Sequence, residues 1–298
     1  MDSQRTIRKQ VTLDGIGLHS GKPVRLTLSP APPDSGIVFR VPGSEPIAAA
    51  PESVIDSHYA TTLGRGAARV QTVEHLLAAT AGLGIDNLDV RLDGSEVPAM
   101  DGSAKPFVAL LLSAGRARLN ARRRALSIPY PVRVGSEGRW LQIVPSDRLR
   151  VSYTLDHEHP AIGTQVMSWT ATERSFVEDF APARTYGFLK DLGVIRKRGL
   201  AQGVSLDNTI GVGDGGVLNG LRYRDEFVRH KVLDLVGDLA LLGRPLLGHV
   251  IARNAGHALN YELVLAIQRA VGLVRRTAPA TVMHAAADAR LSPVSAAI

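Results

Sequence analysis

The segment Glu226-Phe-Val-Arg-His-Lys-Val-Leu-Asp234 opens the most strongly periodic stretch of this chain, about 225–242. Its apolar residues recur every three or four positions, which is the pattern of an amphipathic helix. His230 and Asp234 are four residues apart, so they share one face of this helix and could hold a metal ion from a rigid base. Asp238 continues the same face. Taken alone the spacing is a weak signal, because many helices carry such a pair as a surface ion pair.

A second helix is expected from Val73 to Ala81, with Thr72 as its N-cap. Glu74 and His75 open it. Neighbours on a helix diverge by about 100°, so these two cannot chelate one ion side by side. They can divide the work, with His75 as a ligand and Glu74 beside a metal-bound water. The alternative is a first turn in which Glu74 only favours the helix dipole.

A third polar segment, Asn254-Ala-Gly-His-Ala-Leu-Asn260, lies where a loop meets a helix expected over about 261–274. His257 within it could be a general acid, a third metal ligand, or a histidine that hydrogen-bonds within its loop. The sequence alone leaves all three roles open.

The two halves of the chain have a similar order of elements. Each has several alternating strand segments, then a helix, a glycine, a strand, a polar loop and a helix. We therefore predict an α+β fold of two similar domains, 1–120 and 125–276, that face each other with the site between them. The arginine-rich stretch 115–124 marks the expected boundary, because periodicity lapses there. Residues 277–298 are expected to form a flexible tail.

Composition narrows the chemistry further. The chain of 298 residues has no cysteine, which excludes disulfides and thiolate metal ligands and fits a reducing cytosol. No apolar run is long enough to span a bilayer.

The net charge of +7 raises the question of nucleic-acid binding, but aromatic residues do not accompany the basic clusters. A solvated linker, or attraction to anionic lipid or phosphate, explains these clusters better. The arginines concerned are Arg116, Arg118, Arg122, Arg123, Arg124, Arg275 and Arg276.

Several ordered motifs resemble the zinc-dependent UDP-3-O-acyl-N-acetylglucosamine deacetylase family of lipid A synthesis, and the resemblance covers nearly the whole chain. The motifs are Gly15-Ile-Gly-Leu-His-Ser-Gly21, Thr72-Val-Glu-His-Leu76, Gly82-Leu-Gly-Ile-Asp-Asn87, Met100-Asp-Gly-Ser-Ala104, Ala183-Arg-Thr-Tyr-Gly-Phe188, Asp225-Glu-Phe-Val-Arg-His-Lys231 and Gly256-His-Ala-Leu-Asn260.

The resemblance implies that Zn2+ is held by His75, His230 and Asp234. It also implies that Glu74 is the base on zinc-bound water, and that His257 is the cationic partner at the leaving amine.

The resemblance extends to a second set of residues. Asp238 would orient His257 and raise its pKa, and Thr185 would donate its hydroxyl to the oxyanion. Lys231 would meet the polar part of the substrate. The resemblance implies a fold of two two-layer α/β-sandwich domains, each with an insertion. The segment 187–212 corresponds to the insertion that forms an acyl-chain passage. Phe188 and Tyr186 would contact the substrate there, although Tyr186 stands where a phenylalanine is often found.

The expected activity is hydrolytic deacetylation of the acylated UDP-sugar, which is the committed step of lipid A synthesis. A cytoplasmic monomer is expected, with no nucleic-acid partner and no stable membrane insertion but with room for peripheral contact. Two alternatives stay open: a non-catalytic binder of sugar nucleotide or lipid, and a zinc amidohydrolase with another substrate. The sequence does not decide whether Glu74 or His257 protonates the leaving amine.

Overall fold

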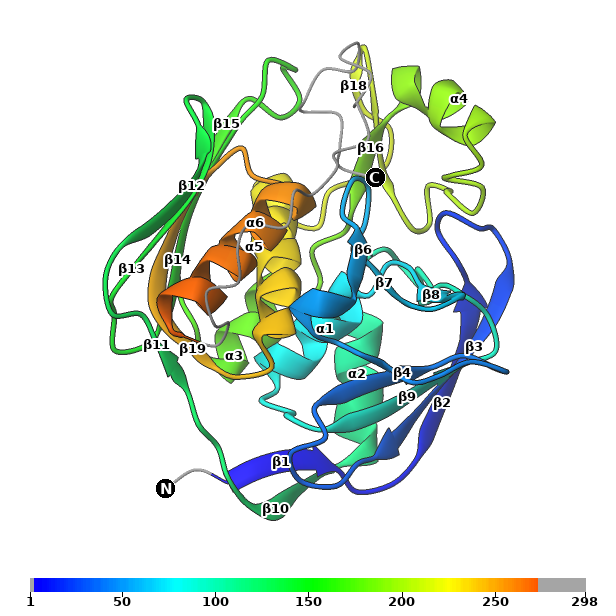
Figure 1. Cartoon of the computed structure of the whole chain (residues 1–298). Helices are drawn as coiled ribbons and strands as arrows, with labels where there is room; N and C mark the ends of the chain where they lie inside the picture. Colours follow the sequence, from blue (N-terminus) through cyan, green and yellow to red (C-terminus); the bar gives the residue numbers. More distant parts are fainter. Residues whose placement is uncertain (1–2, 273–298) are drawn as a thin grey trace.

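A computed structural model describes residues 3–272 of the chain, so the expected tail at 277–298 lies outside the described residues. Within that range, no helix is both long enough and apolar enough to cross a membrane. Two sheets stand on opposite outer sides of the molecule, and helices fill the space between them (Figure 1).

The N-terminal half contains a five-stranded sheet with the order β2-β3-β9-β4-β5. All neighbouring strands in it are antiparallel except β4 and β9, which run parallel. Buried and exposed residues alternate along β3, which shows that one face of the sheet packs inward. The strands are β2 (Val11–Ile16), β3 (Pro23–Pro30), β4 (Ile37–Arg40), β5 (Ile47–Ala48) and β9 (Leu88–Leu92).

The C-terminal half repeats this arrangement with the order β12-β13-β19-β14-β15. The strand β19 enters the middle of this sheet, as β9 does in the N-terminal sheet. It runs antiparallel to β13 and parallel to β14. A short additional strand, β11, pairs in parallel with β19. The strands are β11 (Leu126–Ser127), β12 (Val132–Ser136), β13 (Arg139–Val144), β14 (Leu149–Asp156), β15 (Thr164–Thr170) and β19 (Leu246–Arg253).

Each half places one helix before its last strand and one helix after it. The N-terminal pair is α1 (Glu74–Gly82) and α2 (Lys105–Ala114), and the C-terminal pair is α5 (Glu226–Leu239) and α6 (His257–Ala270). A 3-10 turn, η3 (Ala240–Leu242), ends α5. The matching sheet orders and helix positions confirm the predicted fold of two similar α+β sandwiches. The exact domain bounds stay a prediction.

An insertion interrupts each half between its fourth strand and its first helix. In the N-terminal half it contains η1 (Pro51–Ser53) and a small sheet of β6 (Val54–Asp56), β7 (Thr62–Arg65) and β8 (Ala68–Val70). In the C-terminal half it contains α3 (Glu173–Ser175), the π-helical turn η2 (Phe176–Phe180), β16 (Tyr186–Phe188), α4 (Leu189–Lys197), β17 (Ile210–Gly213) and β18 (Gly216–Val217).

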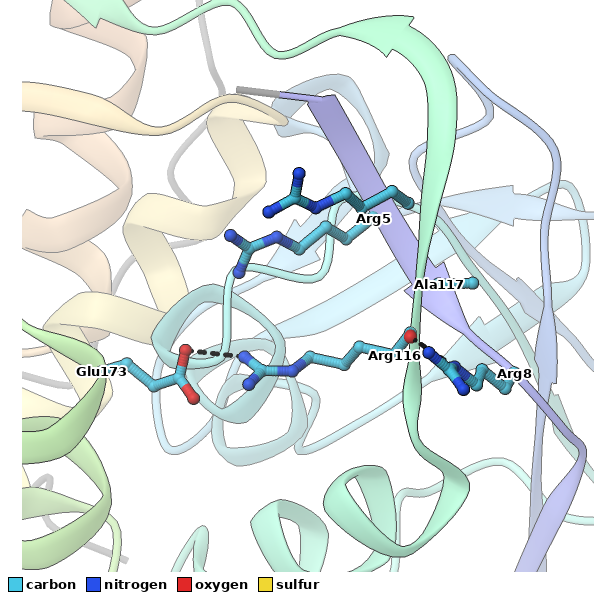
Figure 2. Close-up of a pocket in the computed structure, with 6 residues that line it drawn as sticks. Arg5, Arg8, Arg116, Ala117 and Glu173 are labelled. Carbon is cyan, nitrogen blue, oxygen red and sulfur yellow. Dashed lines mark hydrogen bonds and ion pairs between the residues drawn. The ribbon is translucent and has the colours of Figure 1, made fainter. Parts of the chain in front are cut away.

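The arginine-rich stretch expected to be a linker is instead a regular strand, β10 (Arg116–Arg122), which pairs antiparallel with β1 (Ser3–Ile7). Figure 2 shows the two strands crossing, with Arg5 and Arg116 projecting to the same side. The stretch alternates polar residues with Ala and Leu, which suits a strand. Its partner lies more than a hundred residues earlier in the chain, and local periodicity gives no sign of that pairing.

Two helix starts differ from expectation. The N-cap of α1 is Val73, not Thr72. Thr72 has a φ of 61°, which is unusual for a β-branched residue, and its hydroxyl donates to Glu96 Oε1 at 3.1 Å rather than capping the helix. Helix α6 begins at His257, four residues earlier than predicted, so His257 is the first residue of the helix. At both turns a side chain hydrogen-bonds to a residue distant in sequence, Thr72 to Glu96 and His257 to Asp238.

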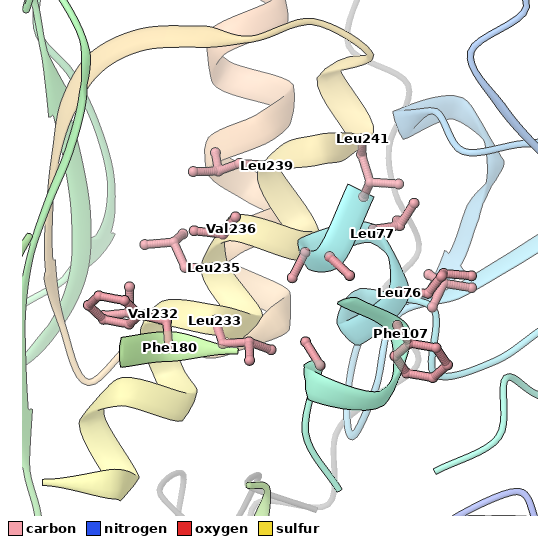
Figure 3. Close-up of a cluster of buried hydrophobic side chains, with 14 of the residues drawn as sticks. Leu76, Leu77, Phe107, Phe180, Val232, Leu233, Leu235, Val236, Leu239 and Leu241 are labelled. Atoms are coloured by element: carbon pink, nitrogen blue, oxygen red, sulfur yellow. The ribbon is translucent and has the colours of Figure 1, made fainter. Parts of the chain in front are cut away.

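The core lies where α1 and α5 pack against each other between the two sheets. Figure 3 shows Leu233 on the side of α5 that faces α1, and Leu76 of α1 beside Phe107 of α2. Gly237 on α5 allows a close approach, because a Cβ there would lie 2.1 Å from the backbone oxygen of Glu74. This crossing brings the polar start of α1 to the polar face of α5.

Candidate active site

Three side chains predicted as metal ligands converge at the α1–α5 crossing. His75, His230 and Asp234 are all buried, and one ligand atom from each lies within 4.8 Å of the others. Asp234 Oδ1 is 3.5 Å from His75 Nε2 and 3.3 Å from His230 Nε2. The two histidine rings meet edge to face, with their centroids 5.0 Å apart. The structure therefore brings these three residues together, whereas their spacing in the sequence only allowed a shared metal site.

The hydrogen bonds around this cluster fit a bound cation. His230 Nδ1 lies 3.1 Å from the carbonyl oxygen of Ala183, so a proton on Nδ1 leaves the Nε2 lone pair directed at the cluster. Asp234 Oδ1 is buried and forms no hydrogen bond within the described part of the chain. An anionic oxygen in that state needs a positive partner, which a metal ion would supply. Two imidazole nitrogens and one carboxylate form a ligand set typical of hydrolytic metal sites.

Asp234 stays ionised despite its burial. Burial raises the pKa of this carboxyl group, but His230 and Lys231 outweigh that effect and hold the pKa well below the usual range. The Lys231 ammonium donates to Asp234 Oδ2 at 3.2 Å. Lys231 thus contacts a metal ligand directly, and the contact to the polar part of the substrate predicted for it stays a prediction.

Glu74 is fully enclosed, with an exposed fraction of 3%. Its Oε2 accepts a hydrogen bond from the backbone N–H of Thr61 at 3.0 Å. Burial raises the pKa of Glu74, and the opposing effects of His257 and His75 do not cancel that rise. A carboxylate with a raised pKa takes up a proton more readily near neutral pH, which is what a general base requires.

His257 is buried at the start of α6 and its Nδ1 lies 2.8 Å from Asp238 Oδ2. Burial lowers the pKa of His257, but the charge and hydrogen bond of Asp238 outweigh it and raise the pKa to about 9. Its Nε2 is 3.9 Å from Asp234 Oδ2, so the ring points at the metal cluster. A cationic imidazole is a poor metal ligand and a good proton donor, which favours the acid role among the three that the sequence left open.

Asp238 is held by two further hydrogen bonds. Thr61 Oγ1 donates to Asp238 Oδ1 at 2.5 Å, and Asn260 Nδ2 donates to Asp238 Oδ2 at 2.8 Å. Thr61 therefore hydrogen-bonds to Glu74 through its backbone and to Asp238 through its side chain. It lies in the N-terminal insertion, just before β7, and nothing in the sequence around it signals this role.

Comparison with known proteins identifies the family of this chain. A family model of UDP-3-O-acyl N-acetylglycosamine deacetylase matches residues 4–269. The chain belongs to this family. Its members are metalloenzymes, and membership makes the chain a hydrolase of the deacetylase class.

Curated relatives of that name cover most of the chain. The enzyme from Oleidesulfovibrio alaskensis is 50% identical over 263 residues, covering 87% of this chain and 86% of its own length. That from Myxococcus xanthus is 50% identical over 267 residues, with 88% and 85% covered. That from Acidithiobacillus ferrooxidans is 48% identical over 274 residues, with 90% of each covered.

The C-terminal insertion of this chain forms an apolar groove. It has a volume of about 190 Å³. Phe188 lines it, and His157 stacks on that ring with centroids 4.9 Å apart. The lining residues are mostly apolar: Gly187, Phe188, Leu189, Leu192, Val204, Ser205, Leu206, Thr209, Gly211 and Leu218. Every lining residue except Leu218 falls within the segment 187–212, which was expected to form an acyl-chain passage.

Tyr186 is the first residue of β16 in the same insertion, and Thr185 directly precedes it. Tyr186 is buried, edge to face with Phe227 at 4.9 Å, and Lys231 Nζ is 5.6 Å from its ring. It is not among the residues that line the groove, so a direct substrate contact from Tyr186 stays a prediction. Thr185 is buried too, and its backbone N–H donates to the carbonyl of Gly102 at 2.8 Å, which ties the insertion to the N-terminal half.

The family motif Gly15–Gly21 contains a buried histidine, His19. His19 has an exposed fraction of 1%, and neither ring nitrogen forms a hydrogen bond within residues 3–272. Its loop is fixed by Glu96, whose carboxylate accepts from the backbone N–H groups of His19 at 2.7 Å and Ser20 at 2.8 Å. Sequence reasoning missed Glu96, because its partners lie some 76 residues away.

Proposed function

We propose that this chain hydrolyses the acetamide of UDP-3-O-acyl-N-acetylglucosamine to acetate and the free amine, with zinc as its metal. The observation that carries the proposal is the convergence of three buried ligand atoms, from His75, His230 and Asp234, beside two groups suited to proton transfer, Glu74 and His257. The relatives that match this chain bear the name of that activity.

Zinc is the metal that this donor set favours. Two imidazoles and one carboxylate provide three protein ligands and leave a fourth position open, the arrangement of catalytic zinc sites. When bound, zinc would lower the pKa of a coordinated water toward ~7 and polarise the acetamide carbonyl.

Glu74 removes a proton from the attacking water. Its raised pKa lets it hold that proton, and its hydrogen bond from the Thr61 backbone fixes one carboxylate oxygen. The position at the N-terminus of α1 sets Glu74 beside His75 in sequence but on a different side of the helix. The base is therefore placed next to the metal cluster without acting as a ligand in it.

Protonated His257 stabilises the negative charge that develops on the acetamide oxygen, together with the hydroxyl of Thr185. A preorganised cation of this kind contributes on the order of several kcal/mol to the transition state. Asp238 keeps the imidazole charged and oriented, because its carboxylate accepts a hydrogen bond from Nδ1–H of His257. This leaves Nε2 of His257 directed toward the cluster. The departing amine takes its proton from His257 or from Glu74.

The acyl chain of the substrate would lie in the groove of the C-terminal insertion, against Phe188. This assignment rests on the apolar lining and on the connection of β16 to Thr185.

Gly211 limits the width of the groove, because a Cβ there would be 2.9 Å from Leu206 and 3.0 Å from Leu218. Gly211→Val should lower kcat/KM for long acyl chains more than for short ones, with Gly193→Ala on α4 as a control.

We further infer a monomeric, cytoplasmic enzyme that does not act on nucleic acid. The absence of cysteine suits a reducing compartment.

Metal analysis combined with an acetate-release assay on the acylated UDP-sugar tests the proposed function. We expect about one zinc per chain and acetate release that a chelator abolishes and added zinc restores. Bound zinc without acetate release would indicate the non-catalytic binder instead. Acetate release from other acetamides but not from the UDP-sugar would indicate an amidohydrolase of another specificity.

A further inference from the structure

A second group of charged side chains lies on the β1–β10 sheet. In Figure 1 this sheet is at the lower end of the molecule, while α4, β16 and β18 of the groove-forming insertion are at the upper end. Arg5 stands directly opposite Arg118 in the antiparallel register. Arg116 lies two residues from Arg118, so both project from the same face of the strand. Three guanidinium groups therefore share one face of this small sheet.

The acidic residues nearby are already paired with other arginines. Glu173 Oε2 accepts from Arg116 Nη1 at 2.6 Å, and Asp86 Oδ1 accepts from Arg123 Nε at 2.7 Å. Asp86 Oδ2 accepts from the backbone N–H of Arg5, not from its side chain. Across the described range 3–272, the guanidinium groups of Arg5 and Arg118 form no hydrogen bond and no ion pair.

Like charges directly opposite each other destabilise a pair of strands. The N-terminal sheet shows the usual solution, in which Asp14 stands opposite Arg25 and the two form an ion pair at 2.7 Å. The Arg5–Arg118 pair has the same antiparallel geometry without an acidic partner. A bound anion would supply the missing charge.

The space beside these arginines can hold such an anion. An open cavity of about 560 Å³ is lined by Arg5, Arg8, Arg116, Ala117, Arg118 and Glu173. Figure 2 shows the side chains of Arg5 and Arg116 extending toward Glu173, and Arg8 on the other side of the strand. Planar guanidinium groups recognise phosphate oxygens in pairs, which a single ammonium group cannot do.

We propose that Arg5 and Arg118 form a binding site for a phosphate group, separate from the metal cluster. The group comes either from a small soluble phosphate or from the headgroup of an anionic phospholipid. The site does not depend on the proposed catalytic function.

Calorimetric titration of the full chain with inorganic phosphate at low ionic strength tests the site. We expect saturable binding that is at least about tenfold weaker in Arg5→Gln/Arg118→Gln, a difference equivalent to about 1.4 kcal/mol. Arg25→Gln is the matched control, because it removes an exposed strand arginine that has an acidic partner. Arg118→Glu places a carboxylate opposite Arg5 and should abolish phosphate binding while leaving the fold and acetate release unchanged.

Co-sedimentation with phosphatidylcholine vesicles, with or without phosphatidic acid, separates the two sources. Binding that requires phosphatidic acid and is lost in the double variant assigns the site to a headgroup. Phosphate binding without vesicle binding assigns it to a soluble anion. Equal binding by the parent chain and the double variant in both experiments overturns the proposal, as does an equal loss in Arg25→Gln.

Discussion

The two halves of the molecule share one sheet order but contribute very differently to the site. In the N-terminal half, α1 supplies Glu74 and His75 from its first turn, and the buried residues of α2 are all apolar. In the C-terminal half, α5 buries polar side chains along one whole face, and α6, the counterpart of α2, begins with the buried His257. A repeated topology thus fixes where helices lie, while the side chains decide which half carries the chemistry.

The largest effect is expected from the C-terminal ligand His230. His230→Ala removes one of three ligand atoms and leaves Asp234 buried without its partner, so metal binding should be lost and acetate release should become undetectable. Elemental analysis after dialysis measures the metal. His249→Ala is the control, since among residues 3–272 the side chain of that histidine hydrogen-bonds only to Ser152 on the outer sheet. Full metal content in His230→Ala would show that His230 is not a ligand.

The second-largest effect is expected from His257, the proposed acid in the C-terminal half. His257→Ala should keep its metal but lose roughly 10²–10⁴ in turnover, because the charge that stabilises the oxyanion is gone. The two variants together test the division of roles. If His257→Ala lost metal to the same extent as His230→Ala, His257 would be a ligand and not an acid.

A smaller loss is expected from Asp238→Asn, which preserves shape and removes charge. Its turnover should fall about 10–100-fold with metal content unchanged. Asp238 raises the pKa of His257 to about 9, so removing its charge lowers that pKa. Because the cationic form of His257 is active, activity in Asp238→Asn should disappear at a lower pH as the pH rises. An unchanged upper limb of the pH profile would show that Asp238 does not act through His257.

The smallest effect concerns the contact between the halves. Gly237→Ala would push α5 away from the Glu74 backbone, and we expect a loss of about 1–3 kcal/mol in the free energy of unfolding, measured by denaturant titration. Gly193→Ala on α4, where a Cβ meets no atom within 4 Å, should be neutral or stabilising by up to about 1 kcal/mol. Equal stability of both variants would mean that α1 and α5 can move apart at Gly237 without loss of free energy of unfolding.

Much of the fold was predictable because its signals are local. Helix α5 and the turn η3 together cover nearly the whole range predicted for that helix, about 225–242. The similarity between the halves was visible in the order of helix, glycine and strand. The strand β10 was not, because its periodicity has meaning only once β1 is known to lie beside it.

Of the site, the sequence alone determined the available chemistry: histidines and carboxylates without cysteine, two of them at a spacing that shares a helix face. The motifs then identified the family. Only the tertiary structure decided that Asp234 Oδ1 meets both histidines, that Asp238 charges His257, and that Thr61 links Glu74 to Asp238. The physical reason is that helix periodicity depends on neighbours in sequence. Contacts between α1, α5 and α6 instead depend on how their apolar faces are buried together.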